Sequence, residues 1–113
     1  MDKIEKTLLD LGCDPKHIGF QESRDAIQML IEDPSYEGHV TRDLYYEVGR
    51  GAKSAERTMR YMVKQARESR YFPERAANVA RELDIEEDLL RTTPLRRWLE
   101  LLAHAIGPDW KGG

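Results

Sequence analysis

Helix-breaking residues divide this sequence into short segments in which apolar residues recur every three or four positions. Residues 3–11 place Ile4, Leu8 and Leu11 at this spacing before Gly12, and residues 21–32 carry a second such set before a proline. The spacing is typical of amphipathic helices, and no segment reads convincingly as a strand. The sequence therefore predicts an all-α fold.

Residues 41–69 have the pattern of a helix-turn-helix. Thr41 is expected to cap a short helix over 42–49, which ends where two glycines interrupt the pattern. Ser54 is then expected to cap a second helix that reaches about residue 69. Two helices joined by a short glycine-containing turn define this motif.

The last third of the chain, residues 73–107, is expected to close the core. Pro73 suits the first position of a helix, and Asp84 with Glu87 resembles a capping arrangement that opens a short turn. A final helix starts at Thr93-Pro94, and its apolar stripe consists of Leu95, Trp98, Leu99, Leu102 and Ile106. Because Leu101 and Trp98 widen this stripe, self-association is an alternative to core closure.

Length and composition are those of one globular domain, which we expect to span residues 1–113 with about five to six helices. Of the 113 residues, 40% are hydrophobic and 35% are charged. No apolar run approaches the length of a membrane span, and charges interrupt the first twelve positions. We therefore expect a cytoplasmic protein without a membrane partner.

Positive charge gathers in the middle of a chain whose net charge is −3. Residues 42–75 carry nine cations against five acids. Five of the cations follow one helical face at steps of four and three, namely Lys53, Arg57, Arg60, Lys64 and Arg67. A stable exposed helix usually mixes charges at this spacing, so a surface for a polyanion is favoured over a merely solvated face.

An ordered set of short motifs resembles the C-terminal DNA-binding effector domain of the sporulation-initiation master response regulator. The resemblance covers residues 4–67 and implies a stand-alone or divergent member of that family, or an effector domain excised from a longer regulator. Its motifs are Leu11-Gly12, His17, Gly19-Phe20, Ala26-Ile27, Gly38-His39-Val40-Thr41, Leu44-Tyr45 and Glu56-Arg57-Thr58-Met59-Arg60.

The resemblance implies a DNA-binding transcription regulator whose recognition helix, residues 54–69, enters the major groove of double-stranded DNA. The base-proximal candidates are Lys53, Glu56, Arg57 and Arg60, and those assigned to phosphates are Arg42, Arg50, Lys64 and Arg67. Ser54 stands where the family has a base-reading arginine, and the turn before it is shorter than in the family pattern.

These departures favour an alternative, a protein-interaction module that keeps the fold but has lost sequence-specific DNA binding. Such a module would bind another regulator or itself. A homodimer and a contact with RNA polymerase or a regulator are accordingly further partner hypotheses.

Enzymatic chemistry has little support in the sequence. His17, His39 and His104 lie far apart and lack metal-ligand spacing, so each is expected to serve as a cap or in the core. The single cysteine, Cys13, is expected to be a buried structural thiol. No enzyme activity, metal or cofactor is expected.

Overall fold

Helices account for the regular structure of the described part of the chain, residues 2–38, 43–49 and 54–111 of a computed structural model, and no strand occurs there. The all-α prediction is thus confirmed. The elements are α1 (Lys3–Asp10), α2 (Ile18–Glu32), the 3₁₀ turn η1 (Pro34–Tyr36), α3 (Tyr45–Val48), α4 (Ala55–Glu68), α5 (Phe72–Leu83), α6 (Glu87–Thr92) and α7 (Leu95–Ile106).

The first two helices begin at side-chain caps. The Oδ1 atom of Asp2 accepts a hydrogen bond from the amide of Glu5 at 2.8 Å, which satisfies one of the free amides at the start of α1. In α2 the Nδ1 atom of His17 accepts from the amide of Gly19 at 2.9 Å. The predicted capping role of His17 is therefore confirmed, and its cap makes α2 begin three residues before the expected start.

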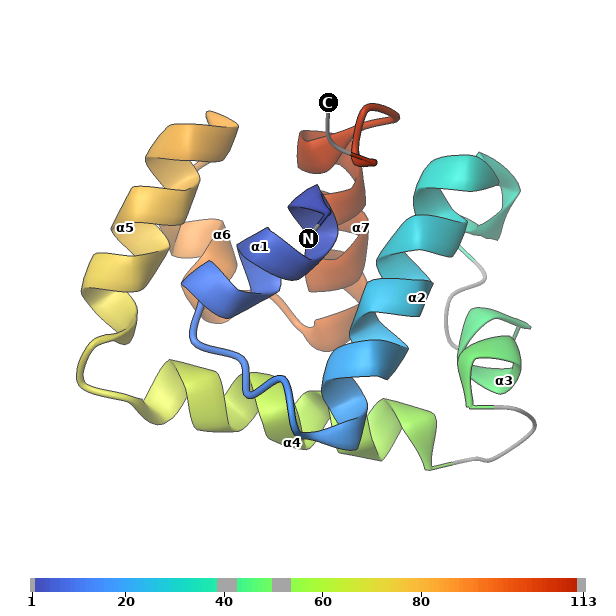
Figure 1. Ribbon diagram of the computed structural model, residues 1–113, viewed down its shortest axis with the longest axis horizontal. Helices are drawn as coiled ribbons and strands as arrows, with labels where there is room; N and C mark the ends of the chain where they lie inside the picture. The colour runs from blue at the N-terminus through green and yellow to red at the C-terminus, as the bar shows by residue number, and fades with distance from the viewer. Residues whose placement is uncertain (1, 39–42, 50–53, 112–113) are drawn as a thin grey trace.

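A core of apolar side chains lies where α2 and α4 meet α1, α5 and α7. Figure 1 shows α4 running along one edge of the molecule, with α1, α2, α5 and α7 on the same side of it. The largest fully buried side chains are those of Ile4, Leu8, Leu11, Ile27, Leu44, Met59, Met62, Leu90, Trp98, Leu99 and Leu102. Helix α5 adds smaller buried side chains such as Ala76 and Val79. Burial of these apolar groups is the main force that holds the helices together.

The predicted apolar stripe of α7 is entirely buried. Of the two residues that widen the stripe, Trp98 is only 2% exposed and Leu101 is half-buried. The stripe therefore closes the core as expected, and Trp98 is not available for self-association.

Asp84 closes α5 instead of opening the next helix, which corrects the predicted capping arrangement. Its backbone is left-handed, with φ of 57°, and the amide of Ile85 then donates to the carbonyl of Ala80 at 3.0 Å. A short polar side chain tolerates this conformation better than most residues do. Helix α6 begins after Glu86, which makes no side-chain cap, and it is a true helix where the sequence indicated a turn.

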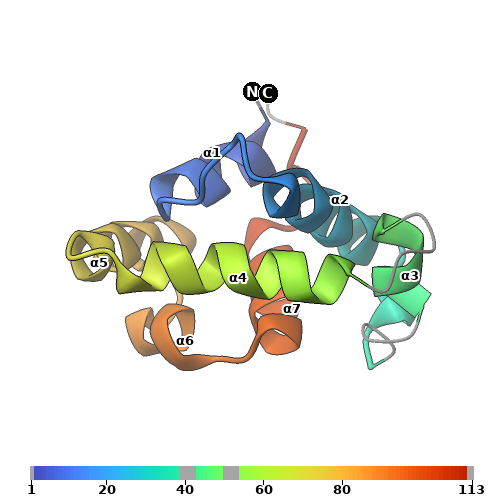
Figure 2. The same ribbon diagram turned by 90° about the horizontal axis from the view of Figure 1, so that it is seen from below.

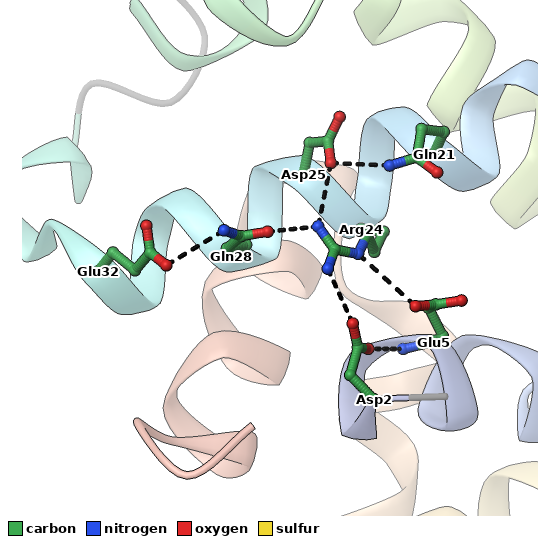
Figure 3. Close-up of polar contacts among 7 residues, drawn as sticks. All are labelled: Asp2, Glu5, Gln21, Arg24, Asp25, Gln28 and Glu32. Carbon is green, nitrogen blue, oxygen red and sulfur yellow. Dashed lines mark hydrogen bonds and ion pairs between the residues drawn. The ribbon is translucent and has the colours of Figure 1, made fainter. Parts of the chain in front are cut away.

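Arg24 joins α2 to the first residues of the described chain, as Figure 3 shows. The guanidinium group of Arg24 pairs with Asp2 at 2.8 Å and with Asp25 at 3.3 Å, and it also bonds the amide oxygen of Gln28. The same group lies 5.3 Å from the ring of Trp110, whose carbonyl accepts from the amide of Lys3 at 2.9 Å. Arg24 thus joins the first helix to the end of the chain.

The remaining sequence predictions concern Cys13 and two histidines, of which His39 lies outside the described residues. Cys13 is buried, and burial raises the pKa of its thiol to about 12, so its predicted structural role is confirmed. His104 is an exception to the expected cap or core role, because it is exposed and pairs with Glu37. None of the helices in the described ranges has the length and apolar character that crossing a membrane requires.

Candidate nucleic-acid interface

Helix α4 begins where the sequence predicts, but without the expected hydroxyl cap. Ser54 has helical backbone angles, φ of −81° and ψ of −12°, and its side chain caps no amide. A capping side chain needs an extended backbone at this position, which explains the difference. The carbonyl of Ser54 instead accepts hydrogen bonds from the amide and the hydroxyl of Thr58.

One face of α4 anchors it in the core. The buried residues of this face are the predicted ones, Ala55, Met59, Met62, Val63 and Ala66. Helix α4 packs against α2, α3, α5 and α7, and the residues on its opposite face are exposed. In Figure 2 α4 lies across the front of the molecule, and no other helix passes over it. The helix therefore has one buried face and one exposed face.

Three of the predicted site cations lie on the exposed face of α4. Arg57, Arg60 and Lys64 are all exposed to solvent. Arg60 forms an ion pair with Glu56 one turn earlier, whereas Arg57 and Lys64 have no ion pair with any residue in the described ranges. Arg57 and Lys64 are thus the cations that this face offers to a ligand, and Arg60 must share its charge with a carboxylate.

Arg67 differs from these cations, and we correct its assignment to a phosphate. Its guanidinium group is turned inward, where Nε donates to the carbonyl of Leu90 at 3.2 Å and Nη2 donates to the carbonyl of Thr93 at 2.8 Å. Burial lowers the pKa of Arg67 from its ordinary value. The side chain therefore ties α4 to α6 and to the link that follows α6, and these contacts hold the guanidinium group away from the exposed face of α4.

Three further candidates, Arg42, Arg50 and Lys53, lie outside the described residues, as does the predicted cap Thr41. The short helix of the predicted helix-turn-helix is present as α3, with Leu44 and Tyr45 buried. Helix α3 packs beside the start of α4, as Figure 1 shows. The described part of the motif thus has the expected order of two adjacent helices.

Sequence reasoning missed a group of residues at the crossing of α2 and α4. Tyr61 is 54% exposed on α4, and its ring stacks on that of His17 with centroids 5.8 Å apart. Gln65, one turn later, donates a hydrogen bond from Nε2 to the hydroxyl of Tyr61 at 3.3 Å. The spacing of four residues from Arg57 to Tyr61 and on to Gln65 was visible in the sequence and indicates a shared side of the helix.

Gly19 explains how closely the two helices approach. A Cβ atom on Gly19 would lie 2.8 Å from the carbonyl oxygen of Thr58 and 3.2 Å from the Cα atom of Met59. The absence of a side chain therefore lets the first turn of α2 rest directly on α4. This contact brings His17 against Tyr61.

Comparison with known families decides the classification. The model of the family described as "Sporulation initiation factor Spo0A C terminal" matches residues 4–83. The chain belongs to this family. The match to the Spo0A C-terminal family, a family of DNA-binding effector domains of sporulation regulators, runs from α1 to the end of α5 and includes α3 and α4. Searches of curated proteins and of solved structures gave no significant match.

Proposed function

We propose that this domain binds double-stranded DNA with α4 lying in the major groove. The observation that carries the proposal is the exposed face of α4. On this face Arg57 and Lys64 form no ion pair with any carboxylate in the described ranges. A rigid helix anchored by methionines on one face and basic on the other suits a groove lined by phosphates. Membership of the Spo0A C-terminal family supports the same function.

The candidate residues on and next to α4 have separate proposed roles. Arg57 and Arg60 lie in the first two turns, where base contacts concentrate, and a guanidinium group recognises guanine by two hydrogen bonds. Glu56 orients Arg60 through their ion pair. Lys64 contacts a phosphate, and Ser54, at the start of the helix, lies near the DNA backbone. We also propose phosphate contacts for Arg42 and Arg50 and a base-proximal position for Lys53.

The test is a salt titration of binding to a random-sequence duplex by mobility shift. We expect log K to fall against log[salt] by about 0.9 for each phosphate contact, and Arg57→Ala with Lys64→Ala to weaken binding and flatten this slope by about two. The control is Arg81→Ala with Arg91→Ala, which removes two exposed cations from α5 and α6 and should leave the slope unchanged. A slope near zero for the unchanged protein would refute the proposal.

A protein-interaction module with the same fold is the second candidate function. The ion pair of Glu56 with Arg60 favours it, because it places a carboxylate among the cations of α4 in a chain of net charge −3. Under this alternative a homologous regulator or a polymerase subunit is the partner. The salt titration separates the two functions, because weak binding that is identical in the α4 variant and the control would favour the protein partner.

A further inference from the structure

The exposed face of α4 carries an aromatic and amide pair beside its cations. Tyr61 lies one helical turn after Arg57 on the same side of the helix, and Gln65 follows it by a further turn. Neither residue belongs to the basic stripe or to the core. Half of the Tyr61 side chain is open to solvent although its ring contacts His17.

The ring of Tyr61 is held from a second helix. His17 is fixed by its own hydrogen bond to the amide of Gly19, and Gly19 rests on the backbone of α4. The stacked rings, 29° from parallel, therefore join the start of α2 to the exposed face of α4. A side chain that is held in this way loses little conformational entropy when it binds a ligand.

The hydrogen bond that Tyr61 accepts determines which kind of ligand atom its hydroxyl can bind. Its hydroxyl oxygen accepts a hydrogen bond from Gln65, so the hydroxyl proton remains free to be donated outward. In the major groove every purine presents N7 as an acceptor, and guanine adds O6. A donor placed beside Arg57 on a helix in that groove faces such atoms.

We propose that Tyr61 donates a hydrogen bond to N7 of a purine in the bound duplex, and that His17 is the positioning residue that holds the Tyr61 ring for this contact. This inference rests on the proposed DNA binding by α4. It adds a specificity-determining residue and a supporting residue that lies outside the recognition helix.

The first experiment locates the contact atom. A duplex is selected from a random pool with the unchanged protein, and each purine near the centre is replaced in turn by its 7-deaza analogue, which lacks the N7 acceptor. We expect one position at which the analogue costs the unchanged protein about fivefold to tenfold in affinity through loss of the Tyr61 contact. Guanines that Arg57 or Arg60 binds at N7 also show a penalty, but theirs should persist when Tyr61 is replaced. In Tyr61→Phe the selected duplex binds more weakly by the same factor, and the 7-deaza base at that position has no further effect.

Tyr71→Phe is the matched control. Tyr71 is half exposed and its hydroxyl also accepts a hydrogen bond from a neighbour, Arg70, but it lies beyond the end of α4. We expect this variant to keep both the affinity and the 7-deaza penalty of the unchanged protein. If Tyr61→Phe kept the penalty at every purine that shows one in the unchanged protein, or if no purine showed one, the proposed contact would be refuted.

The second experiment separates stacking by His17 from capping by His17. His17→Asn keeps an acceptor for the amide of Gly19 but removes the ring, whereas His17→Phe keeps a ring but removes the acceptor. We expect His17→Asn to lose the 7-deaza penalty while it keeps its Tm, and His17→Phe to keep the penalty while its Tm falls. A penalty that disappears only in the variant of lower Tm would show that His17 is merely structural.

Failure of this inference is distinguishable from failure of the proposed function. If the unchanged protein binds duplex with a steep salt slope that depends on Arg57 and Lys64, the proposed function stands whatever Tyr61 does. If the unchanged protein does not bind duplex at all, both proposals fall together.

Discussion

Arg24 and Asp2 illustrate how single side chains hold together segments distant in sequence. Arg24 reaches Asp2 and Glu5 from α2, and Trp110 covers its guanidinium group. Burial would raise the pKa of Asp2, but hydrogen bonds from the amide of Glu5 and from Arg24 outweigh it and hold the pKa below its ordinary value of 3.8. The ionised form of Asp2 is therefore favoured by folding.

Replacement of Asp2 by asparagine tests this charge without removing the cap. Asparagine also accepts from the amide of Glu5 through Oδ1, but its amide nitrogen replaces the oxygen that accepts from Arg24. Asp2→Asn therefore keeps the cap and removes the charged hydrogen bond to Arg24. We expect a loss of about 1–2 kcal/mol in the free energy of unfolding at pH 7. Because a lowered pKa stabilises above the unfolded value and this stability is lost as pH falls, the difference should shrink below about pH 4.

Urea denaturation of both proteins at pH 7 and pH 3 measures this effect. An equal difference at both pH values would contradict the assigned role of the carboxylate.

Arg67 leads to a prediction that separates structural cations from binding cations. Arg67→Met removes both hydrogen bonds to the carbonyls of Leu90 and Thr93, so we expect a loss of about 1–3 kcal/mol in the free energy of unfolding. Its salt slope for DNA binding should equal that of the unchanged protein, whereas Arg57→Ala should flatten the slope by about one. If both variants flattened the salt slope equally, Arg67 would be a DNA-contacting residue after all.

At the scale of the elements, the contact between α2 and α4 positions the proposed recognition helix. The first turn of α2 meets the backbone of α4 at Thr58 and Met59, with no side chain between them. The distance between the two helices therefore depends on a single glycine. The stack of His17 on Tyr61 depends on the same distance.

Gly19→Ala tests this contact. Alanine normally stabilises a helix by about 0.5–1 kcal/mol over glycine. Here the added Cβ atom would lie 2.8 Å from a carbonyl oxygen of α4, and a backbone atom cannot turn aside as a flexible side chain can. We expect a net loss of about 1–3 kcal/mol by chemical denaturation. A gain in stability would show that the helices separate at little cost.

At the scale of the whole molecule, the two ends of the described chain are joined near α2. The carbonyl of Trp110 accepts from the amide of Lys3, and the buried indole lies against Arg24. Trp110 is remote in sequence from both partners and lies beyond the residues that the Spo0A C-terminal family matches. Its packing nevertheless contributes to the stability of the first helix.

Trp110→Ala should destabilise the whole domain. We expect a loss of about 3–5 kcal/mol in the free energy of unfolding, the usual result of removing a buried aromatic side chain. Trp110→Phe should lose less, because it keeps a ring beneath Arg24. A fall in Tm of only a degree or two for Trp110→Ala would show that this end of the chain is not part of the cooperative unit.

The amino-acid sequence by itself determined where most helices lie and which face of α4 is buried. Spacing of three and four residues is a local property, so Met59, Met62 and Val63 could be assigned to the core from their order alone. Gly49 marked the end of α3 and Ser54 marked the start of α4, although the side chain of Ser54 caps no amide.

The tertiary structure alone decided which polar groups each helix meets. Arg67 belongs to the basic stripe by spacing, yet its partners lie 23 and 26 residues further along the chain. His17 and Tyr61 likewise meet only because α2 crosses α4 at Gly19. Such contacts depend on how helices distant in sequence pack together, and helical periodicity holds no information about that packing.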